Sequence, residues 1–466
     1  MTRFNSNIVS KPQIPTTNLA GGEAFKQSAK AELAFAVLTS FLDDKFYESS
    51  SARLERIQNL IREISDHQFL AKLAIITRKE FHMRSTFHVL AAELAKVHRG
   101  DNLVFKVIVN GVERPDDLTE IVAYLGKPIP NQVKKACAKV LQGLSEYSLG
   151  KYKQSRKEVS LVDLFNLTSP KPTSPEQDAM WKKFIKGELK SPDTWEVAIS
   201  ASELHEDKVE EWTRLVLENK LGYMALLRNL NNIDKYASSE AIKIACEKID
   251  NKEEVKKSMQ FPFSFYTAYK HVENQDMLEA ISKGLEYSLE NVPTFEGKTL
   301  IAVDASCSMR NTERAIDIAA LFAGALFKAN NAELIMYDTS VQKVKLLKAT
   351  PILEMSKIME SLVNGGATRT SLVFEYALQE KFDRIVIISD NESWSEHNVQ
   401  NVYDRYRKFN DSFVYAIDIA GYGTIDIKSS KKVFHLAGWS EKIFDFMSVA
   451  EKGKNFVQWI DSYSID

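Results

Sequence analysis

The chain has 466 residues, and 44% of them are apolar, so it is long enough for two or three domains with cores of their own. Its 61 basic residues nearly balance its 63 acidic ones, so the net charge gives no sign of a polyanionic partner. Three scattered cysteines argue against a disulfide framework, and no apolar run reaches the roughly 18 residues that a membrane span requires. We therefore expect a cytoplasmic protein.

The first 290 residues divide into a short arm and a long helical region. Residues 1–17 are polar, lack an apolar stretch of signal-peptide length, and are predicted to form a flexible arm. From 18 to 290, apolar residues recur three and four positions apart, as in 31–38, 69–76 and 87–94. Helices joined by short polar turns over such a length predict an α-solenoid of stacked helix pairs rather than one bundle.

From 291 to 466, strand patterns alternate with helical patterns. The run Ile385-Val386-Ile387-Ile388 is continuously β-branched, as a strand buried on both faces requires. We predict a doubly wound, mostly parallel α/β domain that binds ligands at the carboxyl ends of its strands. The expected strands are 299–303, 333–337, 343–347, 384–389, 413–419 and 432–436, and the expected helices are 312–328, 352–362, 372–379, 399–408 and 441–452.

The sequence Asp304-Ala305-Ser306-Cys307-Ser308 directly follows the first of these strands. It places one carboxylate and two hydroxyls in a loop at the carboxyl edge of the sheet. Such hard oxygen donors suit an octahedral cation such as Mg²⁺. The pattern resembles the metal-ion-dependent adhesion site of von Willebrand factor A domains, which usually binds a ligand rather than catalysing a reaction.

That resemblance implies two further ligands from later loops. A glycine-containing loop, 365–370, offers Thr368, with Thr370 as a substitute because Ala367 interrupts a stretch that is usually richer in glycine. Asp390 follows the strand 384–389. Ordinary strand-end polar residues, or a purely structural cation, would leave a similar pattern. The candidate ligands of a divalent cation, with Mg²⁺ as the expected ion, are Asp304, Ser306, Ser308, Thr368 and Asp390.

Enzymes with an α/β domain provide the competing interpretation. Neither a Gly-x-Gly-x-x-Gly motif nor a phosphate-binding loop follows the first strand. Cys307 would need a paired histidine to act as a nucleophile, and the sequence nominates none. We therefore expect a binding protein without catalytic activity of its own.

Three segments of the helical region resemble the TROVE module of Ro-type autoantigen proteins: 18–22, 81–86 and, above all, Met224-Ala225-Leu226-Leu227-Arg228-Asn229-Leu230. With the A-domain behind it, the resemblance covers residues 18–466 and points to a compact bacterial or phage member of the family. It implies a closed ring of HEAT-like repeats, 18–290, bridged by an A-domain, 291–466. It also implies Y RNA-like small non-coding RNA on the outer surface and single-stranded ends of misfolded RNA in the central hole. RNA quality control with an exoribonuclease partner is the implied role.

Basic residues concentrate between 131 and 190, where 12 basic residues face 6 acidic ones. Lys182, Lys186 and Lys190 recur every four residues, so we expect them on one helix face. The interleaved Tyr147, Tyr152 and Trp181 could stack on bases. An ordinary solvated helix face is the alternative interpretation. The candidate RNA contacts in this window are Lys134, Lys135, Lys139, Lys151, Lys153, Arg156, Lys182, Lys186 and Lys190.

Two arginines outside this window complete the set of RNA candidates. Arg228, inside the Leu-Leu-Arg-Asn-Leu motif, either bonds to a neighbouring repeat or contacts a phosphate in the central hole. Arg84, at an expected helix start, is open to the same two interpretations.

One stretch departs from the family pattern. Where Ro proteins carry His, Lys and Arg, this chain has Leu161, Val162 and Asn166, so the helix-end contact to Y RNA could be missing. The alternative function is therefore a protein-interaction scaffold, in which the metal of the A-domain binds an acidic partner and RNA has no role.

Overall fold

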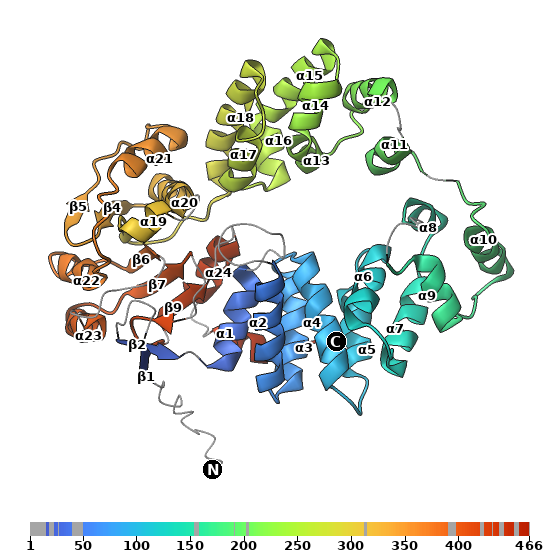
Figure 1. The fold of residues 1–466 in the computed structure, drawn as a ribbon, viewed down its shortest axis with the longest axis horizontal. Coiled ribbons are helices and arrows are strands. Elements are labelled where there is room, and N and C mark those ends of the chain that lie inside the picture. The colour runs from blue at the N-terminus through green and yellow to red at the C-terminus, as the bar shows by residue number, and fades with distance from the viewer. Residues whose placement is uncertain are drawn as a thin grey trace.

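The helical region and the α/β domain lie side by side and together form a ring in the computed structural model (Figure 1). No helix of the described residues is both long and apolar enough to cross a membrane. The structure describes residues 15–17, 23–26, 28–39, 50–152, 158–190, 192–201, 205–311, 315–389, 398–419, 424–430, 432–437, 442–451 and 456–465.

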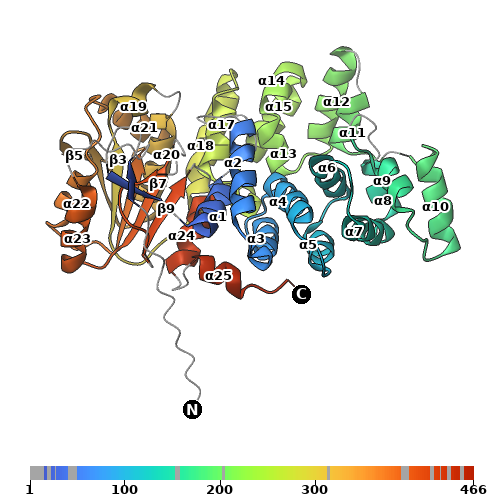
Figure 2. The same cartoon turned by 60° about the horizontal axis from the view of Figure 1, so that its bottom comes forward.

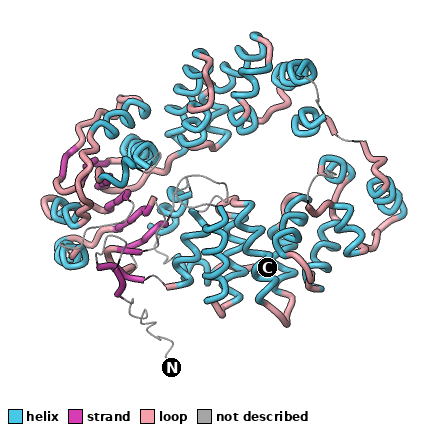
Figure 3. Tube along the Cα trace, viewed as in Figure 1, coloured by secondary structure: helices cyan, strands magenta, loops and turns pink. Residues whose placement is uncertain are grey.

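Helices α1 to α18 follow one another around the ring, and the strands are confined to one sector of it (Figure 3). Many helices pack on a near neighbour in the chain, as α3 does on α4 and α17 on α18, which confirms the predicted helical-repeat architecture. The helices are α1 (Ala29–Thr39), α2 (Ser50–Glu63), α3 (His67–Lys79), α4 (Arg84–Val97), α5 (Leu103–Gly111), α6 (Pro115–Leu125), α7 (Asn131–Gln142), α8 (Glu146–Lys151), α9 (Leu161–Thr168), α10 (Pro175–Ile185), α11 (Trp195–Ala201), α12 (His205–Leu217), α13 (Tyr223–Arg228), α14 (Leu230–Tyr236), α15 (Ser239–Ile249), α16 (Lys252–Ser258), α17 (Pro262–Tyr269) and α18 (Gln275–Ser288), after which a short 3-10 turn spans Leu289–Asn291.

Each helix buries one face, as its apolar spacing requires. In α7 the buried residues are Val133, Ala136, Cys137 and Leu141, which lie three and four positions apart and share one stripe. The lysines of α7 fall between them and stay outside the core. The same pattern therefore fixes both the packing of the helix and the face that carries its charge.

The α/β domain contains a six-stranded sheet in the order β5-β4-β3-β6-β7-β9. All neighbouring pairs are parallel except β4 and β5, so the predicted doubly wound, mostly parallel sheet is confirmed. Val303 pairs with Met336 on one side and Ile388 on the other, which aligns the carboxyl ends of β3, β4 and β6. The elements are β3 (Thr299–Asp304), α19 (Cys307–Asn311), α20 (Ala315–Ala329), β4 (Ala332–Tyr337), β5 (Val341–Lys343), α21 (Ile352–Ser361), α22 (Ser371–Ala377), β6 (Arg384–Ser389), α23 (Val399–Phe409), β7 (Phe413–Asp418), β8 (Thr424–Ile425), β9 (Val433–Ala437), α24 (Lys442–Glu451) and α25 (Phe456–Ser462).

Two local predictions differ from the structure. The predicted strand 343–347 lies instead at 341–343, because the chain leaves the sheet after Lys343 and Leu347 is 73% exposed. The last three residues of the predicted arm form the strand β1 (Pro15–Thr17), which pairs with β2 (Glu23–Lys26), and β2 pairs in turn with β8 of the α/β domain. This pairing joins segments about 400 residues apart, which local sequence patterns do not report.

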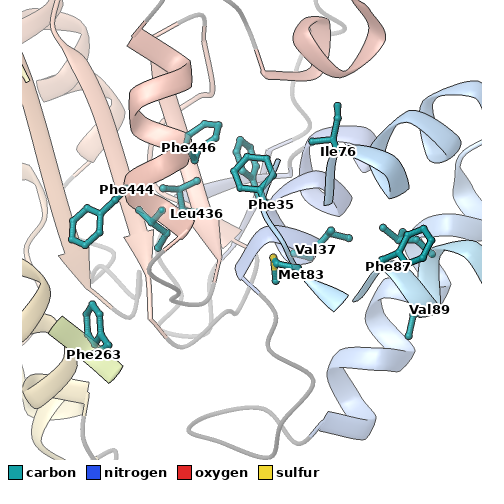
Figure 4. Close-up of a cluster of buried hydrophobic side chains, with 14 of the residues drawn as sticks. Phe35, Val37, Ile76, Met83, Phe87, Val89, Phe263, Leu436, Phe444 and Phe446 are labelled. Carbon is teal, nitrogen blue, oxygen red and sulfur yellow. The ribbon is translucent and has the colours of Figure 1, made fainter. Parts of the chain in front are cut away.

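The α/β domain contacts both ends of the helical region and so closes the ring. On one side, the Tyr266 hydroxyl of α17 donates to Asp317 Oδ2 of α20 at 2.6 Å. On the other, Phe35 of α1 packs edge-on against Phe446 of α24, with ring centroids 5.4 Å apart (Figure 4). Helix α25 then lies against α3, where the Tyr463 hydroxyl donates to Glu80 at 2.9 Å.

Candidate metal centre and nucleic-acid interface

Asp304 ends the central strand β3 and is fully buried at the carboxyl edge of the sheet. A buried carboxylate needs hydrogen-bond donors. Its Oδ1 accepts from the backbone amide of Ser306 at 2.8 Å, while its Oδ2 accepts from Ser389 Oγ at 2.6 Å and Thr368 Oγ1 at 3.3 Å. Ser389 is not among the ligands expected from the sequence, although its place as the last residue of β6 was a usable signal.

The hydroxyls of the first loop lie close enough to share one ion. Ser306 Oγ and Ser308 Oγ are 3.0 Å apart. Adjacent oxygen ligands of an octahedral Mg²⁺ at about 2.1 Å are themselves about 3 Å apart. The structure therefore brings together four of the five predicted ligands: Asp304, Ser306, Ser308 and Thr368. The fifth, Asp390, lies outside the described residues.

The loop 365–370 approaches Asp304 closely because it contains two glycines. Gly365 has a φ of +81°, and its amide donates to the Ala305 carbonyl at 3.1 Å. A Cβ at Gly366 would lie 2.8 Å from Asp338 Oδ2, so a side chain there would push the loop away. Thr368 contacts Asp304 directly, whereas Thr370 lies beside the hydroxyl of Tyr337.

Tyr337 lies fully buried beneath this centre. Burial raises the pKa of its hydroxyl well above the ordinary value, and the charge of Asp304 raises it further, while the hydroxyls of Ser389 and Thr370 oppose the shift. Tyr337 is therefore a neutral phenol. Among the residues that the structure describes, no group of three or more His, Cys, Asp and Glu is arranged to hold a metal ion. The hydroxyl-rich oxygen site at Asp304 is thus the candidate centre for the predicted cation.

The predicted RNA-binding lysines lie on or near α7, α8 and α10, within the segment 131–190 that we call the basic arc. On α7, Lys135 and Lys139 are exposed and Lys134 is half-buried. On α10, Lys182 is exposed but forms an ion pair with Asp178 at 2.7 Å. Lys151, in α8, is half-buried, and Lys153 and Arg156 lie outside the described residues.

The expectation that Lys182, Lys186 and Lys190 share one helix face is wrong for Lys190. Helix α10 ends at Ile185, and Gly187 takes a left-handed φ of +76°. The amide of Glu188 then donates to the Lys183 carbonyl at 2.8 Å, which closes the helix end. Lys190 is exposed in the segment beyond this turn.

Only one of the three predicted stacking aromatics is freely exposed. Trp181 is 4% exposed and packs on Phe165, with ring centroids 5.1 Å apart, so it belongs to the core and its predicted role is wrong. Tyr152 is half-buried, with the guanidinium of Arg114 over its ring at 5.1 Å. Tyr147 is 58% exposed and stays a candidate for base stacking.

Arg84 serves an internal ion network instead of an RNA surface. Its Nε donates to Asp117 Oδ1 at 2.5 Å, and its terminal nitrogen lies 2.6 Å from Asp116. His88 Nε2 is 2.9 Å from the same Asp117 oxygen. Burial opposes ionisation of Asp117, but the hydrogen bonds from His88 and Arg84 outweigh it and hold its pKa well below the ordinary value.

Arg228 behaves differently, because it is exposed at the end of α13 and forms no ion pair with a described residue. The phosphate-contact interpretation therefore stays a prediction for Arg228. The departing stretch near residue 161 forms the start of α9, where Ser160 and Asp163 cap the helix reciprocally. Leu161 is buried and Asn166 is exposed, so the helix start carries no cation at those positions.

Part of the chain matches a known domain family, and most of the structure matches a known fold. The family described as TROVE domain matches residues 185–322. A stretch of 93 residues is 34% identical to telomerase protein component 1 of Mus musculus and 33% identical to that of Rattus norvegicus. This stretch is 20% of the present chain and 3% of either relative, so the chain spans a small part of their length.

The solved structure of the Ro (RSR) protein of Deinococcus radiodurans matches the whole ring. The TM-score is 0.67 at 14% identity, and the match covers 92% of this chain and 100% of that one. At this identity the match establishes the fold: a helical ring joined to a von Willebrand factor A-like domain.

Proposed function

We propose that this chain, which matches the TROVE domain family over residues 185–322 and shares the fold of a Ro protein, is an RNA-binding ring protein of the Ro type. It binds small structured non-coding RNA, similar to Y RNA, on the outer surface of the basic arc. It holds single-stranded ends of misfolded RNA in the central hole and acts in RNA quality control beside an exoribonuclease. The observation that carries the proposal is the set of exposed lysines on α7, on α10 and just after α10 that form no ion pair with a described residue.

These lysines offer charge that no carboxylate in the described part of the chain neutralises. Lys135, Lys139, Lys183, Lys186 and Lys190 are exposed, and none forms an ion pair with a described residue. An RNA that engaged all five would release counterions from its backbone. Binding would then weaken with salt at a log–log slope of about −4.

The two lysine-bearing helices are linked in space. Gln177 Nε2 of α10 donates to the Gln142 carbonyl of α7 at 2.9 Å, and Gln142 Nε2 donates to the Lys171 carbonyl just before α10 at 2.8 Å. Helices α7, α9 and α10 run close together in two views (Figures 1 and 2). One structured RNA could therefore contact lysines from both helices.

A salt-titrated binding assay tests the proposal. A fluorescently labelled RNA hairpin with a single-stranded 3′ tail is titrated with full-length protein at several salt concentrations. We expect clear binding at low salt and a steep loss as salt rises. Absence of binding at low salt, or affinity that ignores salt, would reject the RNA function.

For the A-domain, we propose a Mg²⁺ site held by Asp304, Ser306, Ser308 and Thr368, with Asp390 as the expected fifth ligand. The 3.0 Å spacing of the serine hydroxyls supports it. Bound there, the ion would act as a docking point for a carboxylate of a partner rather than as a catalyst. Calorimetry should detect Mg²⁺ binding to the wild type and lose it in Asp304→Ala. Equal heats from the two proteins would contradict the site.

A protein-interaction scaffold is the second candidate function. It is favoured by the start of α9, where Leu161, Val162 and Asn166 replace the basic residues that the family resemblance implies for the Y RNA contact. In that case the Mg²⁺ site would capture an acidic partner, and the hairpin RNA would fail to bind at any salt concentration.

A further inference from the structure

Two histidines from different helices meet at one end of the α3–α4 pair. His67 is the first residue of α3, and His98 follows the last residue of α4. Because the two helices pack as a pair, positions 31 residues apart become neighbours. Their Nδ1 atoms are 3.0 Å apart, and the rings stand edge to face with centroids 5.2 Å apart.

The outer nitrogen of His98 is held by a carboxylate. His98 Nε2 lies 2.8 Å from Asp101 Oδ1, and the same oxygen accepts from the Leu103 amide at 2.8 Å. With a carboxylate opposite Nε2, the proton of a neutral His98 sits on Nε2. The lone pair of Nδ1 then faces His67. Metal-binding histidines characteristically have such a carboxylate partner on the nitrogen that does not bind the metal.

We propose that His67 and His98 form a site for a late first-row transition-metal ion, bound through the two Nδ1 atoms, with Asp101 as the supporting carboxylate. Neighbouring ligands at about 2.0 Å from a square-planar Cu²⁺ or Ni²⁺ are about 2.8 Å apart, whereas tetrahedral Zn²⁺ spreads them to about 3.3 Å. The observed 3.0 Å is closer to the square-planar spacing. With the ring centroids 5.2 Å apart, the two Nδ1 atoms point almost directly at each other, so each ring must turn before both lone pairs face one ion. Imidazole also suits these ions by its donor softness.

The remaining coordination positions belong to solvent or to an external ligand. No third His, Cys, Asp or Glu in the described part of the chain is placed to complete the set. Asp66, next to His67, is occupied by the Lys30 ammonium at 2.7 Å and by the Phe69 amide at 3.1 Å. The His98 side chain is 12% exposed, which leaves the pair close to solvent.

Without metal, the two rings share one proton in an ordinary Nδ1–H···Nδ1 hydrogen bond. To bind the ion, His67 must carry its proton on Nε2 instead, so that both Nδ1 lone pairs face the metal. Protons compete with the ion for the same nitrogens, so the affinity should fall as the pH is lowered. The charged groups around the pair are Asp66, Lys30 and Asp101, together with Arg99, which donates to the Ala95 carbonyl at 2.5 Å.

Titration calorimetry with NiCl₂ and CuCl₂ on the full chain tests the site, with Mg²⁺ present throughout to fill the A-domain. The matched control is His82→Asn, because His82 is exposed, and asparagine tolerates its left-handed φ of +54°. We expect one binding event in the wild type and the control that is absent from His67→Ala and His98→Ala. Asp101→Asn should bind about 10- to 100-fold more weakly. Unchanged binding in both alanine variants would overturn the site.

The electron paramagnetic resonance of bound Cu²⁺ provides a second readout that does not depend on stability. Two coordinating imidazole nitrogens should appear in the wild type, and this signal should be lost in His98→Gln. A wild-type spectrum without two nitrogen ligands would contradict the proposal even if the alanine variants fail to fold. Neither result bears on RNA binding, because the site is independent of the basic arc.

Discussion

Two arcs of the same helical ring carry opposite charge. The basic arc, 131–190, has 12 basic and 6 acidic residues, whereas the segment 205–290, which we call the acidic arc, has 12 basic and 16 acidic residues. Both arcs are built from short amphipathic helices that bury one face. The apolar pattern that specifies the ring therefore leaves its surface charge free to differ from one arc to the next.

The arcs also differ in how their Lys and Arg side chains form ion pairs. In the acidic arc, Lys252 pairs with Glu290 at 2.5 Å, Lys283 with Glu279 at 3.0 Å, and Arg214 with Glu211 at 2.8 Å. Such exposed pairs add little stability, but they neutralise charge. In the basic arc, Lys182 pairs with Asp178, whereas none of five exposed lysines forms an ion pair with a described residue: Lys135, Lys139, Lys183, Lys186 and Lys190. The TROVE match, 185–322, lies mainly over the acidic arc, so the match and the excess of positive charge lie mainly in different parts of the chain.

The largest expected effect is on stability, and it should come from replacing Arg84, which is paired with buried carboxylates. Arg84→Ala would leave the buried Asp117 without its closest cation and should destabilise the fold by about 3 kcal/mol, measured by chemical denaturation. RNA affinity of the folded variant should stay within twofold of the wild type. A large loss of RNA affinity with little loss of stability would instead show that Arg84 contacts RNA.

The same network predicts a pH dependence. The pKa of Asp117 is lowered in the folded protein, so its contribution to stability is present above its unfolded pKa, near 3.8, and is lost as the pH falls through the lower folded value. Asp117→Asn should therefore be less stable than the wild type at pH 7, with the difference shrinking at acid pH. A difference that stays constant between pH 7 and pH 3 would exclude this mechanism.

The next prediction compares how Lys→Glu changes in the two arcs affect RNA affinity. The combined change of Lys135, Lys139, Lys183 and Lys186 to Glu should weaken binding of the RNA hairpin by about 100-fold and reduce the magnitude of the salt slope by about 3. Four exposed lysines of the acidic arc provide a control with the same change of charge, and their combined change to Glu should alter affinity by less than threefold: Lys235, Lys243, Lys256 and Lys257. Equal losses in both variants would show that only total charge matters.

The smallest expected effect on RNA binding concerns Lys182, which is paired with Asp178. Asp178→Asn releases Lys182 from its exposed ion pair, which is worth only about 0.3–0.5 kcal/mol. Stability should hardly change, while RNA affinity should rise about twofold and the salt slope should steepen by less than 1. Weaker RNA binding in this variant would indicate that Lys182 points away from the RNA.

Local sequence patterns located the elements well wherever burial was continuous. Strand 384–389 was predicted to the residue because its β-branched run is buried along its whole length. The loop after Asp304 was assigned correctly to the sheet edge, since parallel strands align their carboxyl ends. The pairing of β2 with β8 and the contact between His67 and His98 join distant segments, and no local pattern reports them.

Side-chain roles were harder to predict than elements. Trp181 and Arg84 look like surface residues by type and spacing, but the first packs on Phe165 and the second faces Asp116 and Asp117. Which lysines stay unpaired also depends on neighbours that meet only in three dimensions. Periodicity fixes the buried face of a helix, whereas the partners of its polar residues follow from tertiary packing.

The most direct measurement of the central claim is lysine acetylation, read by mass spectrometry, with and without the RNA hairpin. The exposed lysines of the basic arc (Lys135, Lys139, Lys183, Lys186 and Lys190) should be protected by RNA, while Lys243, Lys256 and Lys257 of the acidic arc should react equally in both states. Protection confined to the acidic arc, or none on either arc while RNA is bound, would contradict the assignment of RNA to the basic arc.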